Sequence, residues 1–226
     1  AGLATFDTAI AVDDLLPENI KANRLGSLIE KQDQHFRSAA ATRREYHAMT
    51  RGWIVNEVFR RVDPAGRTLG EYLAEEISGP LNADVVVGLN DAQLRRVSDI
   101  TPLSIRHHIL ASFRPKIFGR KVLHNFFQLM ARLLKVVLTA RKNFSAGKPP
   151  IQNRRSVNVF NDGRMRRGET PSANTHASAR GLAQIAAAMA AGGQLGSVEC
   201  LSRSAWDLLH KDPQPASMGG VLPTRF

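Results

Sequence analysis

Few residues in this 226-residue sequence stand in a pattern that supports chemistry on its own. The Gly-x-Ser-x-Gly nucleophile elbow, the Gly-x-Gly-x-x-Gly dinucleotide fingerprint, the P-loop and the His-Glu-x-x-His zinc motif are all absent from it. The adjacent His107 and His108 would point in different directions on a helix, and the other histidines show no metal-ligand spacing. Cys200 is the only cysteine, which excludes an intrachain disulfide and a cysteine-based zinc site. We therefore expect no metal and no cofactor.

The stretch from Tyr46 to Leu81 predicts two helices joined by a turn. The first helix is expected to bury an apolar face formed by Trp53, Ile54, Val58, Phe59 and Val62. Thr68 precedes Glu71 by three residues, which predicts a capping box at the start of the second helix. The apolar face of that helix is formed by Leu69, Tyr72, Leu73 and Ile77. Gly79 is expected to be its C′ residue, and Pro80 ends it.

The rest of the chain is expected to add little sheet. Residues 84–89 contain three consecutive valines and predict a strand. Residues 151–169 have the composition of a loop, with a turn at residues 161–163. An alanine-rich helix is predicted over residues 177–191 and ends at two glycines. Its expected buried face is formed by Leu182, Ile185, Ala186 and Met189. A last helix is predicted over residues 205–210.

Two stretches resemble the serine β-lactamase-related family, which includes class C β-lactamases, low-molecular-weight penicillin-binding proteins and family VIII carboxylesterases. The first, from Tyr46 to Leu89, is YHAMTRGWIVNEVFRRVDPAGRTLGEYLAEEISGPLNADVVVGL. The second, from Thr170 to Cys200, is TPSANTHASARGLAQIAAAMAAGGQLGSVEC. The resemblance implies an α+β parent fold in which a helical subdomain is inserted into an antiparallel sheet. Residues 1–226 would be a single partial domain, mainly α, with few short strands and an incomplete sheet.

The resemblance also implies acyl transfer through a serine. In this family a serine in a Ser-x-x-Lys motif attacks a carbonyl or lactam, and the lysine one turn later can take its proton. A tyrosine from a Tyr-x-Asn motif or a variant of it shares the proton transfer. A strand with Lys/His-Thr/Ser-Gly helps form the oxyanion hole. The substrate would be a small ester or amide.

Three residues become site candidates through this resemblance. Tyr46 matches the family tyrosine and is the candidate catalytic residue, although it could also be an ordinary anchor of its helix. Ala48 stands where many members have Asn, and His47 follows the tyrosine as in esterase-like members, so an esterase-like branch is favoured. Ser172 and Asn174 would lie at the entrance of the alanine-rich helix, where they either cap it or approach the mouth of the substrate site.

The other two catalytic elements of the family are missing from the sequence. Its single Ser-x-x-Lys string, Ser145–Lys148, follows Tyr46 instead of preceding it, and Gly147 and Pro149 oppose the helix that would align its serine and lysine. No Lys/His-Thr/Ser-Gly string is present. We expect a fragment or processed form of a serine hydrolase that is inactive on its own. The alternative is a non-catalytic scaffold or membrane-binding member of the same fold.

A basic helical segment lies at about residues 101–148. Residues 101–160 hold 12 basic and no acidic residues, against a net charge of +11 for the whole chain. Apolar residues between Val122 and Leu138 recur there at helical spacing. The wide apolar stripe, with Phe126 and Phe127, favours contact of residues 116–142 with an anionic membrane surface over nucleic-acid binding. A solvated, family-specific insertion is the third interpretation.

The sequence leaves the compartment open. No run reaches the ~18 apolar residues of a membrane span. The first fourteen residues lack the basic and apolar regions of a signal peptide, and the chain has no initiator Met. The single cysteine suits a reducing compartment, and it also suits a secreted protein that needs no disulfides.

Overall fold

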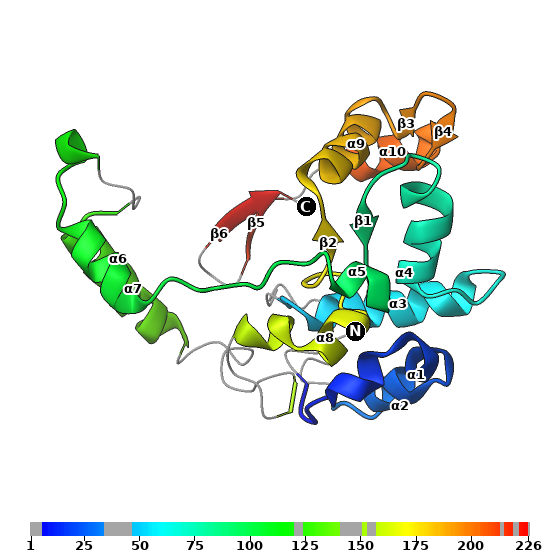
Figure 1. Cartoon of the computed structure of the whole chain (residues 1–226), viewed down its shortest axis with the longest axis horizontal. Helices are drawn as coiled ribbons and strands as arrows, with labels where there is room; N and C mark the ends of the chain where they lie inside the picture. Colours follow the sequence, from blue (N-terminus) through cyan, green and yellow to red (C-terminus); the bar gives the residue numbers. More distant parts are fainter. Residues whose placement is uncertain are drawn as a thin grey trace.

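The computed structural model describes residues 6–33, 47–119, 124–140, 151–152, 157–212, 215–218 and 222–225. Within these ranges the chain is mainly helical and carries three separate two-stranded antiparallel sheets. An isolated parallel bridge also joins Ile10 to Ile151. The expectation of mainly α structure with few short strands is confirmed (Figure 1).

Helices follow one another along most of the described chain. The α-helices are α1 Pro17–Lys21, α2 Arg24–Glu30, α3 Thr50–Val62, α4 Leu69–Tyr72, α5 Asp91–Leu94, α6 Ile105–Ser112, α7 Phe126–Ala140, α8 Gly163–Arg167, α9 Ala179–Ala190 and α10 Arg203–His210. Short 3-10 helices form at Val12–Leu15, Lys116–Phe118 and Val157–Asn161, and a π-helix at Leu73–Ser78 continues α4. The paired strands are β1 Val85–Val86 with β2 His176–Ala177, β3 Gln194–Leu195 with β4 Val198–Glu199, and β5 Pro215–Met218 with β6 Leu222–Arg225.

Most of the described buried apolar residues form two clusters. Core 1 gathers side chains from the N-terminal helices, α3 and the α8 region: Phe6, Ile10, Leu15, Ile20, Leu25, Trp53, Ile151, Val159 and Met165. Core 2 lies where the π-helix, β1 and α9 meet and contains Leu81, Ala83, Val85 and Ala188. Partly buried residues such as Leu73, Ile77 and Ile185 pack around core 2.

Helix α3 does not bury the apolar face that its sequence predicts. Trp53 is fully buried, but Val58 is 56% exposed and Val62 is 71% exposed. The buried side of the helix carries Asn56 and Glu57 instead. Because each residue turns an α-helix by about 100°, Val58 lies on the side opposite to Asn56. The prediction of a single apolar buried face was therefore wrong for the second half of this helix.

The start of α4 agrees with its predicted capping box, and its end differs from the expectation. The Thr68 hydroxyl accepts from the Glu71 amide at 3.3 Å, and the Glu71 carboxylate accepts from the Thr68 amide at 2.9 Å. Gly79, expected as a left-handed C′ residue, has φ −62° because its amide closes the π-helix onto the carbonyl of Ala74 at 2.9 Å. The left-handed residue comes later, at Asn82 with φ 49°.

Two further expectations are corrected. Residues 151–169 are not simply loop, since Val157–Asn161 is a 3-10 helix and Asp162 caps α8 by accepting from the amides of Arg164 and Met165. In α9 the buried positions are Gly181 and Ala188, while Leu182 is 59% exposed and Ala186 is also exposed. A Cβ on Gly181 would lie 2.7 Å from the Asp84 amide nitrogen, so this glycine fixes which face of α9 meets the chain before β1.

Candidate functional site

A buried carboxylate joins three segments of the chain, and one of them contains Ser172 and Asn174. Glu169 is 1% exposed, and its Oε1 accepts from the Thr68 hydroxyl at 2.6 Å. Its Oε2 accepts from the Asn56 amide at 2.8 Å and from the backbone of Gly70 at 3.2 Å. Gly70 permits this approach, because a Cβ there would lie 2.5 Å from Glu169 Oε1. Hydrogen bonds to this one carboxylate thus connect α3, the first turn of α4 and the chain after α8.

Burial dominates the electrostatics of this carboxylate. Desolvation raises the pKa of Glu169 above its ordinary value, and the hydrogen bonds from Thr68, Asn56 and Gly70 only partly oppose it. All three donors bond to the carboxylate, and the Asn56 side chain also accepts from the Leu69 amide at 2.8 Å. We therefore interpret Glu169 as a structural centre that fixes the backbone around the candidate site.

The turn after Glu169 contains both Ser172 and Asn174. Thr170 accepts a hydrogen bond from the Trp53 indole at 3.0 Å, which anchors the turn to core 1. Asn174 is buried: its Oδ1 accepts from the Thr170 amide at 2.8 Å, and its Nδ2 donates to the carbonyls of Met165 and Gly168, each at 2.8 Å. Every polar atom of the Asn174 side chain is engaged with backbone.

Ser172 lies against the start of α3. Its hydroxyl is placed to donate to the carbonyls of Ala48 at 2.9 Å and Met49 at 3.1 Å. Gly52 makes this contact possible, because a Cβ there would lie 2.7 Å from both the amide nitrogen and the hydroxyl of Ser172. Neither Ser172 nor Asn174 caps α9, since Ser178 does so by accepting from the Gly181 amide. The structure therefore brings Ser172 to the backbone two and three positions after Tyr46 in the sequence.

The structure does not describe two of the sequence candidates. Tyr46 and the Ser145–Lys148 string lie outside the described residues. The neighbouring His47 is described, and its Nδ1 lies 2.7 Å from the Thr50 hydroxyl in the first turn of α3. The role of Tyr46 therefore stays a prediction.

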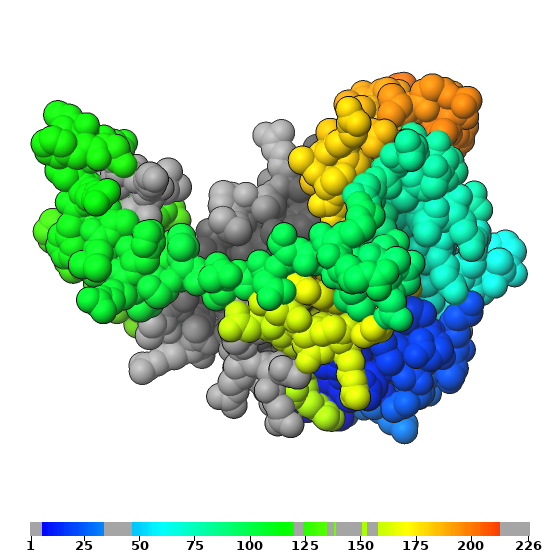
Figure 2. All heavy atoms as spheres, viewed as in Figure 1, coloured from blue at the N-terminus to red at the C-terminus, as the bar shows by residue number. Residues whose placement is uncertain are grey.

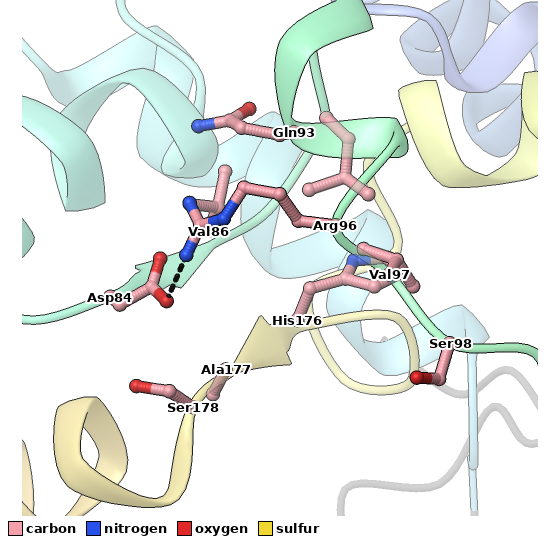
Figure 3. Close-up of a pocket in the computed structure, with 10 residues that line it drawn as sticks. Asp84, Val86, Gln93, Arg96, Val97, Ser98, His176, Ala177 and Ser178 are labelled. Atoms are coloured by element: carbon pink, nitrogen blue, oxygen red, sulfur yellow. Dashed lines mark hydrogen bonds and ion pairs between the residues drawn. The ribbon is translucent and has the colours of Figure 1, made fainter.

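A cavity that sequence reasoning did not predict lies beside the β1–β2 ladder, with a volume of about 500 Å³ (Figure 3). One wall is formed by α5 and the residues after it, including Arg96 and Ser98, and the other by His176 to Ser178. Arg96 reaches across to Asp84, with an ion pair of 2.6 Å that Figure 3 marks by a dashed line. No motif in the sequence marks these residues, because they come together only through the pairing of two-residue strands.

His176 lines this cavity, and its surroundings shift the pKa of its imidazole. Burial, and then the charge of Arg166, lowers the pKa of His176, while the backbone of Asn174 opposes the change. The imidazole is therefore neutral at pH 7. Its Nδ1 atom is buried and makes no hydrogen bond of normal geometry within the described residues. The wall of the cavity therefore holds this imidazole together with the Arg96–Asp84 ion pair.

Metal binding and membrane spanning receive no support from the described residues. They contain no group of three or more His, Cys, Asp or Glu side chains placed to hold a metal ion. None of the described helices has the length and apolar content needed to cross a bilayer.

Comparison with known proteins finds similar solved structures but no matching family model. No known family model matches the sequence, and no curated protein matches it. Among solved structures, the whole chain is similar to a novel penicillin-binding protein homolog from Caulobacter crescentus, with 26% identity and a TM-score of 0.62. It is also similar over its whole length to a family VIII carboxylesterase, with 22% identity and a TM-score of 0.66. The chain spans 50% of each of these structures, so it has the serine β-lactamase-related fold over about half the length of such proteins.

Proposed function

We propose that this chain forms part of a β-lactamase-related serine hydrolase that cleaves a small ester or amide by acyl transfer. One observation carries the proposal: over its full length the chain is similar to half of a penicillin-binding protein homolog and half of a family VIII carboxylesterase. The resemblance of residues 46–89 and 170–200 to the same family supports it independently of the coordinates.

Tyr46 is the residue of this chain that we assign to the chemistry. In an acyl transfer its phenol would share the proton that leaves the nucleophilic serine. The contact of Ser172 with the carbonyls of Ala48 and Met49 supports this assignment, because it fixes the backbone two and three residues beyond the tyrosine. Ser172 would then act as a positioning residue at the mouth of the substrate site, and Asn174 would hold the turn that presents it.

An ester is the favoured substrate. His47 follows the tyrosine as a histidine often does in esterase-like members, and Ala48 stands where many members of the family have Asn. One of the two similar structures is a carboxylesterase. We therefore expect esters with a small acyl group to be cleaved faster than a β-lactam.

The 226 residues alone are proposed to be inactive, because their one Ser-x-x-Lys string follows Tyr46 and is interrupted by Gly147. Purified chain should show no hydrolysis of p-nitrophenyl butyrate or nitrocefin above that of its Tyr46→Phe variant. The longest product of the same gene should hydrolyse the ester and react covalently with a fluorophosphonate probe. In that product, Tyr46→Phe should lower kcat by about 100-fold or more.

Tyr72→Phe provides the matched control, since Tyr72 is the other tyrosine of the chain and packs edge-to-face on Phe59 at 4.9 Å. It should leave kcat unchanged. A longest gene product that neither turns over the ester nor takes up the probe would overturn the hydrolase proposal. That result would favour the second candidate, a non-catalytic scaffold, which the missing catalytic strings in this sequence also suit.

A further inference from the structure

Helices α6 and α7 form an arm, defined here as residues 105–119 and 124–140, that stands apart from the two cores. Figure 1 shows the arm at one end of the molecule, joined to the body by the extended chain after α5. Its helices pack on each other: the rings of Phe113 and Phe126 stack at 4.5 Å with an interplanar angle of 19°, and Ser112 is buried. In the space-filling view the green arm extends away from the coloured body (Figure 2).

The arm exposes large apolar side chains in addition to the pair that it packs internally. The most exposed are Ile117 at 87%, Phe127 at 80% and Phe118 at 75%. Phe127, Leu134 and Leu138 follow one another at intervals of seven and four residues, which places them along one side of α7. Among the described residues of the arm, Ile105 and Leu110 are also exposed, and Phe113 of the stacked pair keeps 60% of its surface exposed. Such a concentration of apolar surface marks a site that contacts something else.

The charge of the arm is of one sign. Arg106, Arg114, Lys116 and Arg132 are exposed, and the sequence between residues 101 and 160 contains no acidic residue. Along the sequence, cations neighbour exposed apolar residues, as at Lys116, Ile117 and Phe118. The arm therefore combines exposed apolar side chains, which can insert into an apolar layer, with positive charge that attracts anions.

We propose that the α6–α7 arm docks this protein on an anionic membrane surface. A bilayer with acidic headgroups provides an apolar layer directly beneath a sheet of negative charge, which matches both properties of the arm. Pairing of two arms from two copies would bring like charges together. Nucleic acid would pair with the cations but would leave aliphatic side chains such as Ile117 and Leu134 in water. The inference does not depend on the proposed hydrolase activity.

Flotation of the whole 226-residue chain with vesicles tests the proposal. We expect binding to vesicles of phosphatidylcholine with phosphatidylglycerol and about tenfold or more weaker binding to phosphatidylcholine alone. Raising NaCl from about 0.05 M to about 0.5 M should release most of the protein. Lys116→Glu with Arg132→Glu should weaken binding by more than tenfold, since each basic residue near the surface contributes a factor of about five.

The apolar contribution is tested by Phe118→Ser with Phe127→Ser, which should weaken binding to acidic vesicles by more than tenfold as well. Leu208→Ser with Leu209→Ser on α10 is the matched control, because these residues are 69% and 65% exposed but lie outside the arm. Arg180→Glu, at an exposed position of α9, controls for charge. All variants change exposed side chains, so their circular dichroism should match that of the unmodified chain.

Several outcomes would overturn the proposal. One is a protein that shows the circular dichroism of folded helices but does not float with acidic vesicles. Another is a control pair that loses binding as fully as the arm variants do. Concentration-dependent dimers in ultracentrifugation without lipid, abolished by the Phe118 and Phe127 changes, would assign the arm to a second copy. Binding to single-stranded RNA in place of vesicles would assign it to nucleic acid.

Discussion

Glu169 shows at the scale of one residue how distant parts of this chain are held together. Its hydrogen bonds from Asn56 and Thr68 span 113 and 101 positions of sequence. Each partner also serves a local structure, since Thr68 caps α4 and Asn56 accepts from the Leu69 amide at 2.8 Å. A change at Glu169 should therefore affect all three segments together.

The stability of the fold should depend on pH through Glu169. Burial raises the pKa of this carboxyl above its ordinary value of 4.5. At pH values between 4.5 and the raised pKa, the folded state therefore keeps a proton that the unfolded state has lost. Its contribution to stability is full below about pH 4.5 and is lost as the pH rises through the raised value. Glu169→Gln should cost about 1–3 kcal/mol at pH 5, and the difference from the unmodified chain should shrink by pH 8. Urea unfolding at several pH values measures this difference.

An exposed glutamate provides the comparison for that experiment. Glu199 in β4 is exposed, so Glu199→Gln should change the free energy of unfolding by less than about 0.5 kcal/mol. A Glu169→Gln penalty that grows between pH 5 and pH 8 would show that the carboxylate is favoured in the fold. Its three donors would then outweigh desolvation.

The close approach of α3 to the turn at Ser172 gives a second residue-scale prediction. Gly52→Ala places a Cβ 2.7 Å from the Ser172 amide, which must move a backbone, and should cost about 1–3 kcal/mol. Ser172→Ala removes only a hydroxyl that donates to the Ala48 and Met49 carbonyls, and should cost about 1 kcal/mol. Thermal unfolding of the two variants decides the order. Equal costs would mean that the turn relaxes freely around the added methyl group.

The capping boxes of α4 and α5 have similar local geometry but different surroundings, so their loss should change the stability of the fold by different amounts. Asn90 and Gln93 cap α5 at an exposed site, and Asn90→Ala should cost about 1 kcal/mol. Thr68 caps α4 but is also fully buried and donates to Glu169. Thr68→Ala should cost that amount plus about 1–3 kcal/mol for the disrupted buried network. Chemical denaturation of both variants measures the difference, and equal penalties would contradict it.

Local signals predicted the start of α4 and the end of α9 better than the buried faces of α3 and α9. The capping box at Thr68 and the glycine pair after α9 depend on a few neighbouring residues, and both form as expected. The exposure of Val58 and Leu182 depends on which segments pack against α3 and α9. Those partners, Glu169 and the chain at Asp84, lie about 100 residues away in sequence, beyond the reach of periodicity.

The candidate site follows the same division. Resemblance to a family selected the turn containing Ser172 and Asn174, and the structure places Ser172 against the start of α3. The full engagement of Asn174 with three backbone groups could not be foreseen, because its partners belong to α8 and the turn itself. The cavity beside His176 could not be predicted from the sequence, since a strand of two residues is too short to show alternation of polar and apolar residues.

At the scale of the whole molecule, a polar network stands between two apolar cores of unequal size. Core 1 contains nine buried residues among those described, and core 2 contains four. Since burial of apolar surface supplies most of the stabilisation, core 2 should be the weaker unit. The hydrogen bonds of Glu169 tie α3, which carries Trp53 of core 1, to the start of α4, which leads into the π-helix of core 2.

This arrangement predicts that Glu169 couples the unfolding of the two cores. In the unmodified chain, amides of α3 and α9 should open with similar free energies, because the network makes them one cooperative unit. In Glu169→Gln, α9 should open at a free energy lower than α3 by about 1–2 kcal/mol, since core 2 must then stand with less support. Hydrogen exchange of peptides from the two helices, followed by mass spectrometry in low urea, measures both values. A uniform decrease in both helices would show that direct packing, and not the buried carboxylate, transmits stability between the cores.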